Sequence, residues 1–373
     1  MDNRGRTAPT AESGIPLIAT NCIKDDQLYP VFENVRYVDQ DTYDNWFRSH
    51  PEPGDIVFVL KGSPGKVALV PDPVSFCIAQ DMVALRANRT FVDPRYLYYV
   101  LRSPSTRQLV SNLHVGTMIP HFKKGDFGKL WLTVETDVTT QRAIAEVLCA
   151  LDDKIAANTK LVNTADALCA ALTRSALDSQ ASQSLSSIAV LTMGTSPAGT
   201  SFNEEGHGSV FYQGVRDFGV RFPRRRVWTT SPLRFAETGD CLLSVRAPVG
   251  QLNLASEKTC IGRGLASVRS SDSRPKTLFH LLRDAPEIWA PYEAEGTIFG
   301  SINKMQLELI EVPTIVADRA DHLEGQLAAL EASIASALGE IELLVGTRDA
   351  LLPQLMSGKL RVKDVEKVLE GVL

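Results

Sequence analysis

Residues 54–65 read Gly-Asp-Ile-Val-Phe-Val-Leu-Lys-Gly-Ser-Pro-Gly, and residues 239–250 read Gly-Asp-Cys-Leu-Leu-Ser-Val-Arg-Ala-Pro-Val-Gly. Each stretch begins with Gly-Asp, continues through an apolar run of strand length, and ends in a glycine-bounded loop that starts with a basic residue. Later features keep the same order, because Leu-Arg at 101–102 is matched by Leu-Arg at 282–283. A period of roughly 180 residues is too long for a solenoid, so the chain contains two copies of one module.

A long helical pattern follows each copy. Apolar residues recur at spacings of three and four from Ile144 to Leu177, and again from Leu323 to Leu355. Both patterns are much longer than an average helix, which favours two helices that pack on each other with coiled-coil character. The alternative is that each helix packs only on its own module. The residues expected at the contact between the helices, or under a partner protein, are Ile144, Leu148, Leu151, Ile155, Leu327, Leu330, Ile334 and Leu338.

These patterns predict an α+β protein with two similar α/β domains, separated by two long antiparallel helices and related by a pseudo-twofold internal repeat. The expected boundaries are residues 1–136 for the first domain, 137–180 for its helix, 181–315 for the second domain, and 316–373 for the second helix and C-terminal tail.

The two copies differ at their start. A strand-like segment, residues 185–191, precedes Thr195-Ser196-Pro197, whereas only six residues precede the matching Thr7-Ala8-Pro9. Either the first domain lacks an edge strand, or its start has been assigned too far downstream. A missing strand would expose the backbone of its neighbour.

The composition is that of an ordinary globular protein, with 44% hydrophobic and 22% charged residues. No apolar run has membrane-spanning length, and no apolar core follows the N-terminus, so we expect neither a membrane segment nor a signal peptide. The six cysteines lie far apart and form no Cys-x-x-Cys pair. Buried thiols in a reducing compartment are therefore favoured over a zinc site or disulfides, and the expected location is the cytoplasm.

The common catalytic signatures are missing from the sequence. Residues 194–199 have the glycine spacing of a phosphate-binding loop, but Thr200 stands where the lysine would be. There is neither a Gly-x-Ser-x-Gly nor a His-Glu-x-x-His motif. Asp152-Asp153-Lys154 could belong to a nuclease signature, but it falls inside the helical pattern, where a charged helix surface is the simpler interpretation. We expect a recognition or assembly subunit without catalytic residues, metal or cofactor of its own.

Basic residues gather in the modules although the net charge is −5 at pH 7. The run Arg224-Arg225-Arg226 lies close to Phe222 and Trp228, and acidic residues gather in the helical segments. A local basic patch is sufficient for binding nucleic acid, whatever the total charge. A solvated surface position is the alternative for each of these arginines.

In combination, these features resemble the specificity subunit of type I restriction-modification systems (the HsdS family). The resemblance rests on Gly-Thr-Ser-Pro at 194–197, on Gly239-Asp240 with Arg246 and Gly250, on the helix that begins Gln-Arg-Ala-Ile at 141–144, and on the tail Leu-Leu-Pro-Gln-Leu-Met-Ser-Gly-Lys-Leu at 351–360. It covers nearly the whole chain.

The resemblance implies a non-catalytic subunit of a phage-defence complex that methylates adenine in DNA. Two target recognition domains would each read one half of a bipartite, asymmetric double-stranded DNA site. The two helices would hold the domains apart and bind two methyltransferase subunits, and restriction subunits would complete the complex. S-adenosylmethionine would then bind the partner methyltransferase subunit, and ATP and Mg would bind the partner restriction subunit.

The residues expected to bind DNA are basic and polar side chains in glycine-bounded loops. Arg and Gln can pair with guanine and adenine edges, and glycine lets the backbone approach the groove. In the first domain the expected residues are Thr20, Asn21, Lys61, Ser63, Lys66, His121, Lys123 and Lys124. In the second domain they are Gly214, Arg216, Arg221, Arg224, Arg225, Arg226, Arg246, Gln251, Ser301, Asn303 and Lys304.

Two other classes of function explain parts of the sequence. A duplicated coiled-coil scaffold without a DNA role would account for the helices but not for the basic loops. An enzyme of unfamiliar type, with a site between the modules, would need catalytic motifs that the sequence lacks.

Overall fold

The computed structural model describes residues 6–113, 118–292 and 300–369. The chain divides into two compact units, of which the first contains residues 1–160 and 338–373 and the second contains residues 161–337. Each unit therefore holds one copy of the module together with a part of both long helices, α3 (Val138–Ala176) and α7 (Ala320–Met356). The α+β class and the two long helices predicted from the sequence are confirmed.

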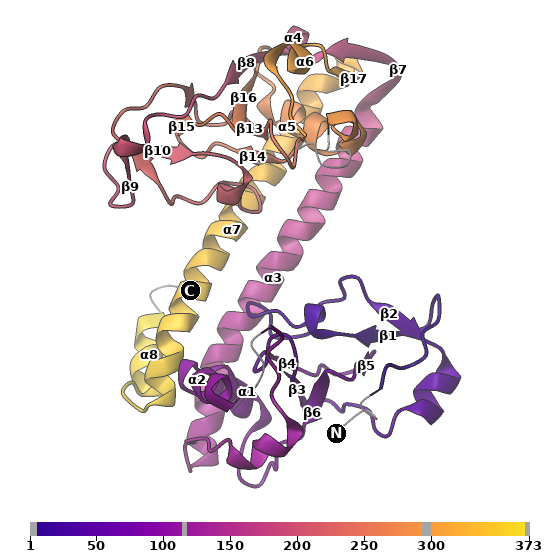
Figure 1. The fold of residues 1–373 in the computed structure, drawn as a ribbon, viewed down its shortest axis with the longest axis vertical. Helices are drawn as coiled ribbons and strands as arrows, with labels where there is room; N and C mark the ends of the chain where they lie inside the picture. The colour runs from indigo at the N-terminus through magenta and orange to yellow at the C-terminus, as the bar shows by residue number, and fades with distance from the viewer. Residues whose placement is uncertain (1–5, 114–117, 293–299, 370–373) are drawn as a thin grey trace. The chain divides into compact units, whose positions relative to one another are not determined.

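The first unit is built on β3 (Ile56–Val59), whose residues are all buried. Side chains alternate between the two faces of a strand. Ile56 and Phe58 accordingly join the core that contains α1 (Pro94–Arg102) and α3, whereas Val57 and Val59 join a second core beneath β1 and β5. Figure 1 shows these elements in indigo to magenta. The other elements are β1 (Ile15–Ile18), η1 (Thr20–Cys22), β2 (Arg36–Val38), η2 (Thr42–Trp46), β4 (Val67–Leu69), β5 (Cys77–Ile78), β6 (Met82–Leu85), α2 (Pro104–Leu113), η3 (Lys124–Lys129) and α8 (Val362–Leu369).

The second unit repeats this plan. Cys241 and Leu243 of its buried strand β13 (Cys241–Ser244) face the core with α5 (Pro275–Arg283), and Leu242 faces the other core. The remaining elements are β7 (Leu177–Ser184), α4 (Leu185–Ile188), β8 (Ala189–Met193), η4 (Gly199–Ser201), β9 (Phe202–Asn203), β10 (Ser209–Tyr212), η5 (Val215–Asp217), β11 (Trp228–Thr229), β12 (Phe235–Ala236), β14 (Leu252–Leu254), β15 (Thr259–Ile261), β16 (Leu265–Ser270), η6 (Pro286–Ile288), η7 (Ala290–Tyr292), α6 (Lys304–Glu308), β17 (Glu311–Ile315) and η8 (Ala317–Arg319).

The pairing of the strands confirms the duplication. β3 pairs antiparallel with β4 and β6, as β13 does with β14 and β16. β1 pairs antiparallel with β2 and parallel with β5, as β10 does with β11 and β15. The copies differ where the sequence predicts it: β8 covers the outer edge of β16, whereas no strand among the described residues pairs with the corresponding edge of β6.

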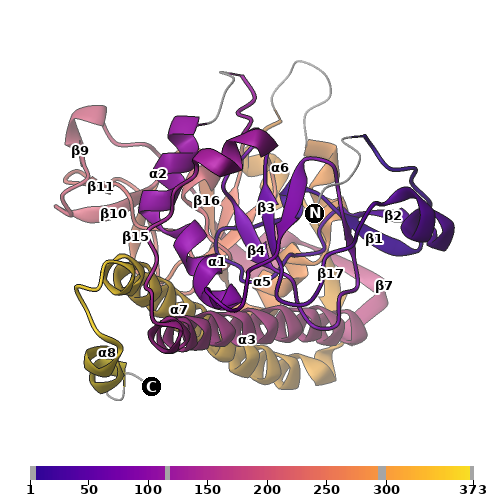
Figure 2. The same cartoon turned by 90° about the horizontal axis from the view of Figure 1, so that it is seen from below.

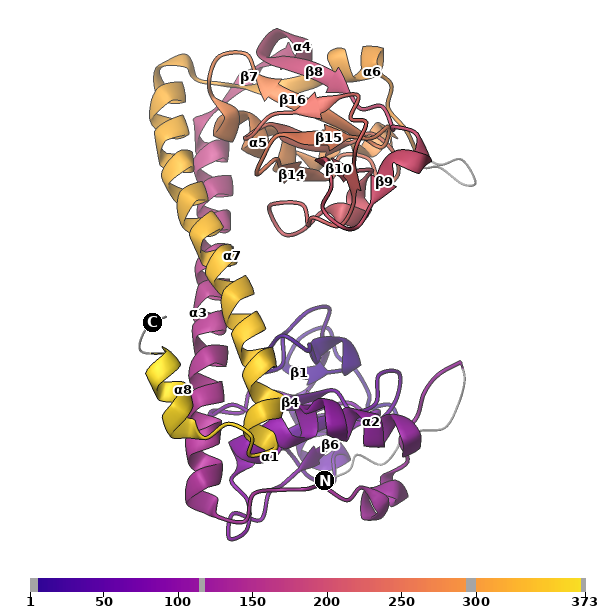
Figure 3. The same ribbon diagram turned by 90° about the vertical axis from the view of Figure 1, so that its left-hand side faces the viewer.

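The long helices contact each other within each unit. In the first unit Arg348 binds Asp152 at 2.6 Å and Asn158 donates to Glu340 at 2.7 Å, so α3 and α7 run antiparallel there. Figures 2 and 3 show the two helices side by side in this unit. In the second unit Arg319, which directly precedes α7, donates to the carbonyl oxygen of residue 175 near the end of α3 at 3.0 Å, which again fits an antiparallel pair. Supercoiling of the helices and a twofold relation between the units stay predictions.

The residues expected along the helix contact are mostly buried. Leu151 and Ile155 pack with Leu344 between the helices, while Ile144 and Leu148 pack in the core that contains α1. The helices thus contact both each other and the module in this unit. The other buried members of the set are Leu327 and Ile334, and its half-buried members are Leu330 and Leu338.

Two further expectations concern buried thiols and membrane segments. All six cysteines are free and buried, as the sequence predicts. Among the helices of the described part of the chain, none combines the length and the apolar character that crossing a membrane requires.

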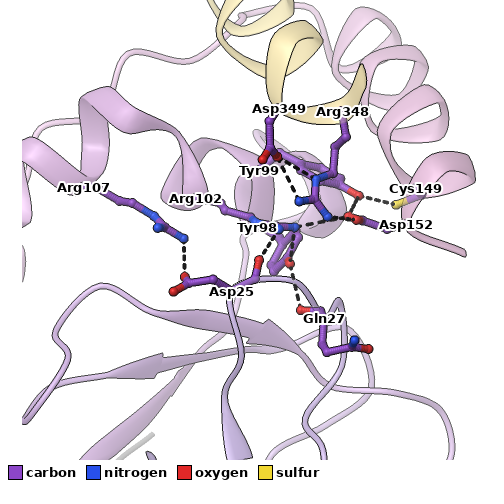
Figure 4. Close-up of polar contacts among 10 residues, drawn as sticks. All are labelled: Asp25, Gln27, Tyr98, Tyr99, Arg102, Arg107, Cys149, Asp152, Arg348 and Asp349. Atoms are coloured by element: carbon purple, nitrogen blue, oxygen red, sulfur yellow. Dashed lines mark hydrogen bonds and ion pairs between the residues drawn. The ribbon is translucent and has the colours of Figure 1, made fainter. Parts of the chain in front are cut away.

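A buried carboxylate, Asp152, lies where α1, α3 and α7 of the first unit meet (Figure 4). It is 2% exposed and accepts a hydrogen bond from the Tyr99 hydroxyl at 2.6 Å. Arg348 donates to its other oxygen at 2.6 Å, and Arg102 approaches it at 3.3 Å. The expectation that Asp152 lies on a charged helix surface is wrong. A carboxylate can be buried here because two guanidinium groups and a hydroxyl replace its water shell.

The second unit has a corresponding cluster around Glu331 of α7, which is 3% exposed. The Nε2 atom of His280 lies 2.9 Å from its Oε1 atom, and the Nε atom of Arg221 lies 3.3 Å from Oε2. Asp166 of α3 accepts hydrogen bonds from both Arg221 and Arg283. In the repeat, Leu101-Arg102 corresponds to Leu282-Arg283, so His280 occupies the place of Tyr99 in the first copy.

In the second cluster, the pKa values of Asp166 and His280 are shifted so that both side chains stay charged at neutral pH. Burial by itself would raise the pKa of Asp166, but hydrogen bonds from Arg283 and Arg221 and their charges lower that pKa to about 2. Burial would likewise lower the pKa of His280, but the nearby polar groups of Asp284, Cys169 and Glu331 raise that pKa to about 10. His280 is therefore a cation at neutral pH, balanced by Asp284, which follows α5, and by Glu331 of α7.

Replacing Leu151 by Ala should lower the free energy of unfolding by about 2–5 kcal/mol, because the substitution leaves a cavity between the helices. Replacing Leu343 by Ala, on an α7 position that is 57% exposed, is the matched control and should cost less than about 0.5 kcal/mol. Urea unfolding followed by circular dichroism measures both. Equal effects of the two substitutions would show that Leu151 is not packed as described.

His280 should make stability depend on pH. Its pKa in the folded chain, about 10, lies above the ordinary value of 6.5, so its charge stabilises the fold fully below pH 6.5. That contribution is lost as pH rises toward about 10. Between these limits the wild type should lose on the order of 3 kcal/mol more of its free energy of unfolding than the His280→Gln variant. Parallel pH profiles of the two proteins would show that His280 is neutral when folded.

Candidate nucleic-acid interface

In both units the glycine-bounded loop after the buried strand meets a second predicted segment. Lys61 forms an isolated antiparallel bridge with His121, and Arg246 forms the corresponding bridge with Ser301. The backbone N–H of residue 62 donates to the carbonyl of residue 120, and that of residue 247 to residue 300, both at 3.0 Å. The structure therefore brings together two chain segments that the sequence predicted to share a function.

The turn between β15 and β16 joins this site in the second unit. The backbone N–H of Val245 donates to the carbonyl of Gly264 at 3.0 Å, which puts the turn beside Arg246. A Cβ atom on Gly264 would lie 2.4 Å from the carbonyl oxygen of Gln213, so only glycine permits this approach. Arg263 lies on the same turn. Its backbone N–H donates to the hydroxyl of Ser196 at 3.2 Å, so the two residues are neighbours.

These contacts define one continuous site, which we call the second loop surface. Its cations make no ion pair with another described residue, and their side chains are exposed. A surface of unpaired cations and amides between glycines has the chemistry that contacts phosphates and base edges. The second loop surface consists of Ser196, Gln213, Gly214, Arg216, Arg246, Arg263 and Ser301.

The first unit has a corresponding site, the first loop surface. The backbone N–H of Leu60 donates to the carbonyl of Asp81 at 2.8 Å, and that of Ala79 to Ile18 at 3.0 Å. The side-chain amide of Gln80 donates to the Thr7 hydroxyl at 3.3 Å. The turn between β5 and β6 therefore lies beside the loop of Lys61, as the turn between β15 and β16 lies beside the loop of Arg246, but the two turns carry different side chains. The first loop surface consists of Thr7, Thr20, Lys61, Gln80 and His121.

Five members of these surfaces were not predicted from the sequence: Thr7, Gln80, Ser196, Gln213 and Arg263. The Gly-Arg-Gly turn at 262–264 was a usable signal, because an exposed arginine between two glycines suits close backbone contact. The positions of Gln80 and Thr7 carry no local signal and follow only from the repeat.

Several predicted residues lie beside the loop surfaces. Ser63 is half-buried in the loop of Lys61, and Asn21 is exposed in η1, where its amide donates to the carbonyl of Glu33 at 2.7 Å. Lys66 is paired with Asp25 at 3.3 Å. The remaining predicted residues of these loops are Lys123 and Gln251, which are exposed, and Lys124, which is half-buried.

The loop from Gly214 to Trp228 divides into exposed and anchored arginines. Arg224 is exposed, and Arg225 is an exposed partner of Glu257 at 2.5 Å. Arg226 is held by Asp217 at 2.9 Å. Arg221 is only 2% exposed, so the prediction that it contacts DNA is wrong. Two carboxylates of the long helices, Asp166 and Glu331, draw this side chain inward.

Asn303 and Lys304 serve α6 instead of an open surface. The Asn303 side chain accepts the backbone N–H of Gln306 at 3.0 Å and caps the helix. Lys304 lies 3.5 Å from Glu308, one helical turn away. Both side chains are exposed, but the side-chain oxygen and the backbone N–H of Asn303 are already bonded to Gln306.

The aspartates of the two repeated Gly-Asp pairs stabilise the backbone that carries both loop surfaces. Asp55 binds Arg86 at 2.9 Å and accepts the backbone N–H of residue 52 at 2.8 Å. Asp240 binds Arg269 at 2.7 Å and accepts the N–H of residue 237 at 2.8 Å. Burial would raise the pKa of Asp240, but its hydrogen bond with Arg269 holds that pKa below the usual range. The carboxylates thereby fix the turns that begin β3 and β13.

One group of residues in the described part of the chain has metal-binding side chains. The ligand atoms of Cys169, His280 and Glu331 lie within 4.8 Å of one another, and all three residues are buried. However, the guanidinium group of Arg221 lies 3.3 Å from Glu331, and its charge would repel a divalent cation at this point. We therefore assign the three residues to the buried ion network.

The comparisons with known proteins agree with this architecture. Residues 11–166 match the family of the type I restriction modification DNA specificity domain. A relative from Methanocaldococcus jannaschii, described as a putative type I restriction enzyme MjaX specificity subunit, is 28% identical over 347 residues, which are 83% of this chain and 79% of that protein.

A solved structure shares this fold. The type-I restriction-modification system S subunit from M. genitalium has a TM-score of 0.63 at 16% identity, and the match covers 92% of each chain. The HsdS subunit from Thermoanaerobacter tengcongensis has a TM-score of 0.39 at 23% identity, over 95% of this chain and 96% of that one.

The resemblance stated from the sequence is confirmed by the matched domain and by the relative that spans most of the chain. A specificity subunit is the non-catalytic DNA recognition member of such a complex. The chain therefore resembles the specificity subunits of type I restriction-modification systems over most of its length, and residues 11–166 match their DNA specificity domain.

Proposed function

We propose that the two loop surfaces each read one half of a bipartite, asymmetric site in double-stranded DNA. The observation that carries this proposal is the repeated contact between a basic loop and a second segment, Lys61 with His121 and Arg246 with Ser301. The frame is the same in both units, while the exposed side chains differ. Two like frames with unlike side chains suit two unlike half-sites.

The chemistry of the second loop surface supports base reading. An arginine can donate two hydrogen bonds to guanine, and an amide such as Gln213 can pair with adenine. Arg224 and Arg225 lie on the neighbouring loop, where their charge suits phosphate oxygens. The first loop surface offers Lys61 and Gln80 in the positions of Arg246 and Arg263, so it should prefer other bases.

The helices supply the surfaces for the other subunits in this proposal. Leu161 and Leu168 of α3 are 45% and 47% exposed and lie two helical turns apart, so they share one helix face. Exposed leucines on one face suit a protein partner. We propose two methyltransferase subunits as these partners, with restriction subunits completing the complex. S-adenosylmethionine would bind in the methyltransferase subunits, and ATP with Mg in the restriction subunits.

The test uses the full chain together with the subunits that co-purify with it, and a duplex that this wild-type complex selects from a randomised library. Arg246→Ala should weaken binding by about 1–3 kcal/mol and relax base preference in one half of the site only. Lys61→Ala should affect the other half. Arg224→Ala should instead weaken all duplexes alike and flatten the dependence of affinity on salt.

Lys359→Ala is the control for this series, because it removes a cation that lies in the C-terminal tail, far along the chain from either loop surface. It should leave both halves of the preference unchanged. If Arg246→Ala relaxed the base preference in both halves of the site, the assignment of the surfaces would be contradicted. It would also be contradicted if Arg246→Ala and Lys61→Ala both left the base preference unchanged. A complex that assembles but selects no duplex would favour the scaffold alternative.

A further inference from the structure

Arg221 connects a loop of the second recognition domain to both long helices. Its Nε atom lies 3.3 Å from Glu331 of α7, and its guanidinium group donates to Asp166 of α3. The backbone carbonyl of Arg221 accepts the N–H of Leu254 at 2.9 Å, so the loop is also fixed to strand β14. With 2% exposure, this side chain has no access to a nucleic acid.

The loop that Arg221 anchors is bonded to the second loop surface. Asp217 accepts the backbone N–H of Gln213 at 3.0 Å, and its carbonyl accepts the N–H of Arg224 at 2.7 Å. Gln213 belongs to the second loop surface, and Arg224 lies three residues after Arg221. A shift of Arg221 would therefore displace groups on both sides of this loop.

The first unit has the same connection, but its arginine lies in a helix of the domain and donates to the loop, whereas Arg221 lies in the loop itself (Figure 4). Arg102 belongs to α1, contacts Asp152 of α3, and donates to the carbonyl oxygen of Asp25 in the loop after η1. The Asp25 carboxylate then binds Lys66 at 3.3 Å and Arg107 at 2.5 Å. In both copies, an arginine links a buried carboxylate of a long helix to one loop, which follows η1 in the first copy and η5 in the second.

We propose that Arg221 and Arg102 are positioning residues that fix these loops against the long helices and so set the geometry of base reading. A buried ion pair contributes little net stability compared with apolar residues of the same volume. It does fix one arrangement, because each partner left alone would be a buried uncompensated charge. The effect on base reading rests on the proposed function, whereas the tethering of the loop does not.

The decisive variant replaces both charges of one pair, Arg221→Met together with Glu331→Met. Apolar residues of similar volume should keep the fold, with a thermal midpoint within about 5 °C of the wild type. Amide hydrogen exchange of residues 215–226, measured by mass spectrometry on the full chain without DNA, should become faster by about tenfold or more. Exchange in β13 and β16 should stay as in the wild type.

The matched control replaces the exposed pair of the same loop, Arg225→Met with Glu257→Met, and should leave exchange unchanged. If the double variant at 221 and 331 fails to fold, Arg221→Lys gives the same test, because it keeps the charge but cannot bridge two carboxylates. Unchanged exchange of the loop in the folded variant overturns the proposal. Faster exchange throughout the second unit overturns it as well, since the pair would then hold the fold and not the loop.

The DNA measurement uses the duplex selected by the wild-type complex and a scrambled duplex. The variant at 221 and 331 should lose about tenfold of its preference for the selected duplex, while its salt dependence stays the same because no phosphate contact is removed. An altered salt slope with unchanged preference would contradict positioning. If the wild type binds no duplex selectively, the proposed function fails, and the exchange measurement still decides whether Arg221 tethers the loop.

Discussion

A carboxylate buried inside a protein needs hydrogen-bond donors, and this requirement organises both halves of the chain. Asp152 and Glu331 sit at corresponding positions of the two long helices and are almost completely buried. Donors reach them from the opposite helix or from the recognition domain, which brings three elements together at each acid. Because the donors are arginine, tyrosine and histidine, the packing of helix against domain has one preferred arrangement and not several.

A comparison of the two copies separates the residues that hold the fold from the exposed residues that we propose to read DNA. The Gly-Asp turns, the buried strands and the loop contacts recur with the same hydrogen bonds. By contrast, Gln80 stands where Arg263 does, and Tyr99 where His280 does. Gene duplication of a module followed by change at exposed loops would produce this pattern. The same comparison indicates which residues belong to the frame: a polar residue that makes the same bond in both copies holds structure.

The sequence predicted the fold well because its signals are periodic or repeated. The apolar run 56–59 predicted a strand, the helical spacing predicted α3 and α7, and the duplicated order predicted equal topology. The burial of Asp152 and Arg221 could not be predicted, because an acid in a helix and an arginine in a basic loop look like surface residues. Their burial depends on partners far away in the sequence. Arg263 differs, because its position between two glycines was a usable signal for close backbone contact, whereas its place beside the loop of Arg246 follows only from the fold.

The most direct test of this account is selection of duplexes from a randomised library by the wild-type complex, followed by sequencing. We expect one enriched motif with two short specified parts, different from each other and separated by an unspecified gap of constant length. A single uninterrupted motif, or two identical half-sites in inverted orientation, would contradict the claim that two unlike loop surfaces each read one half of the site.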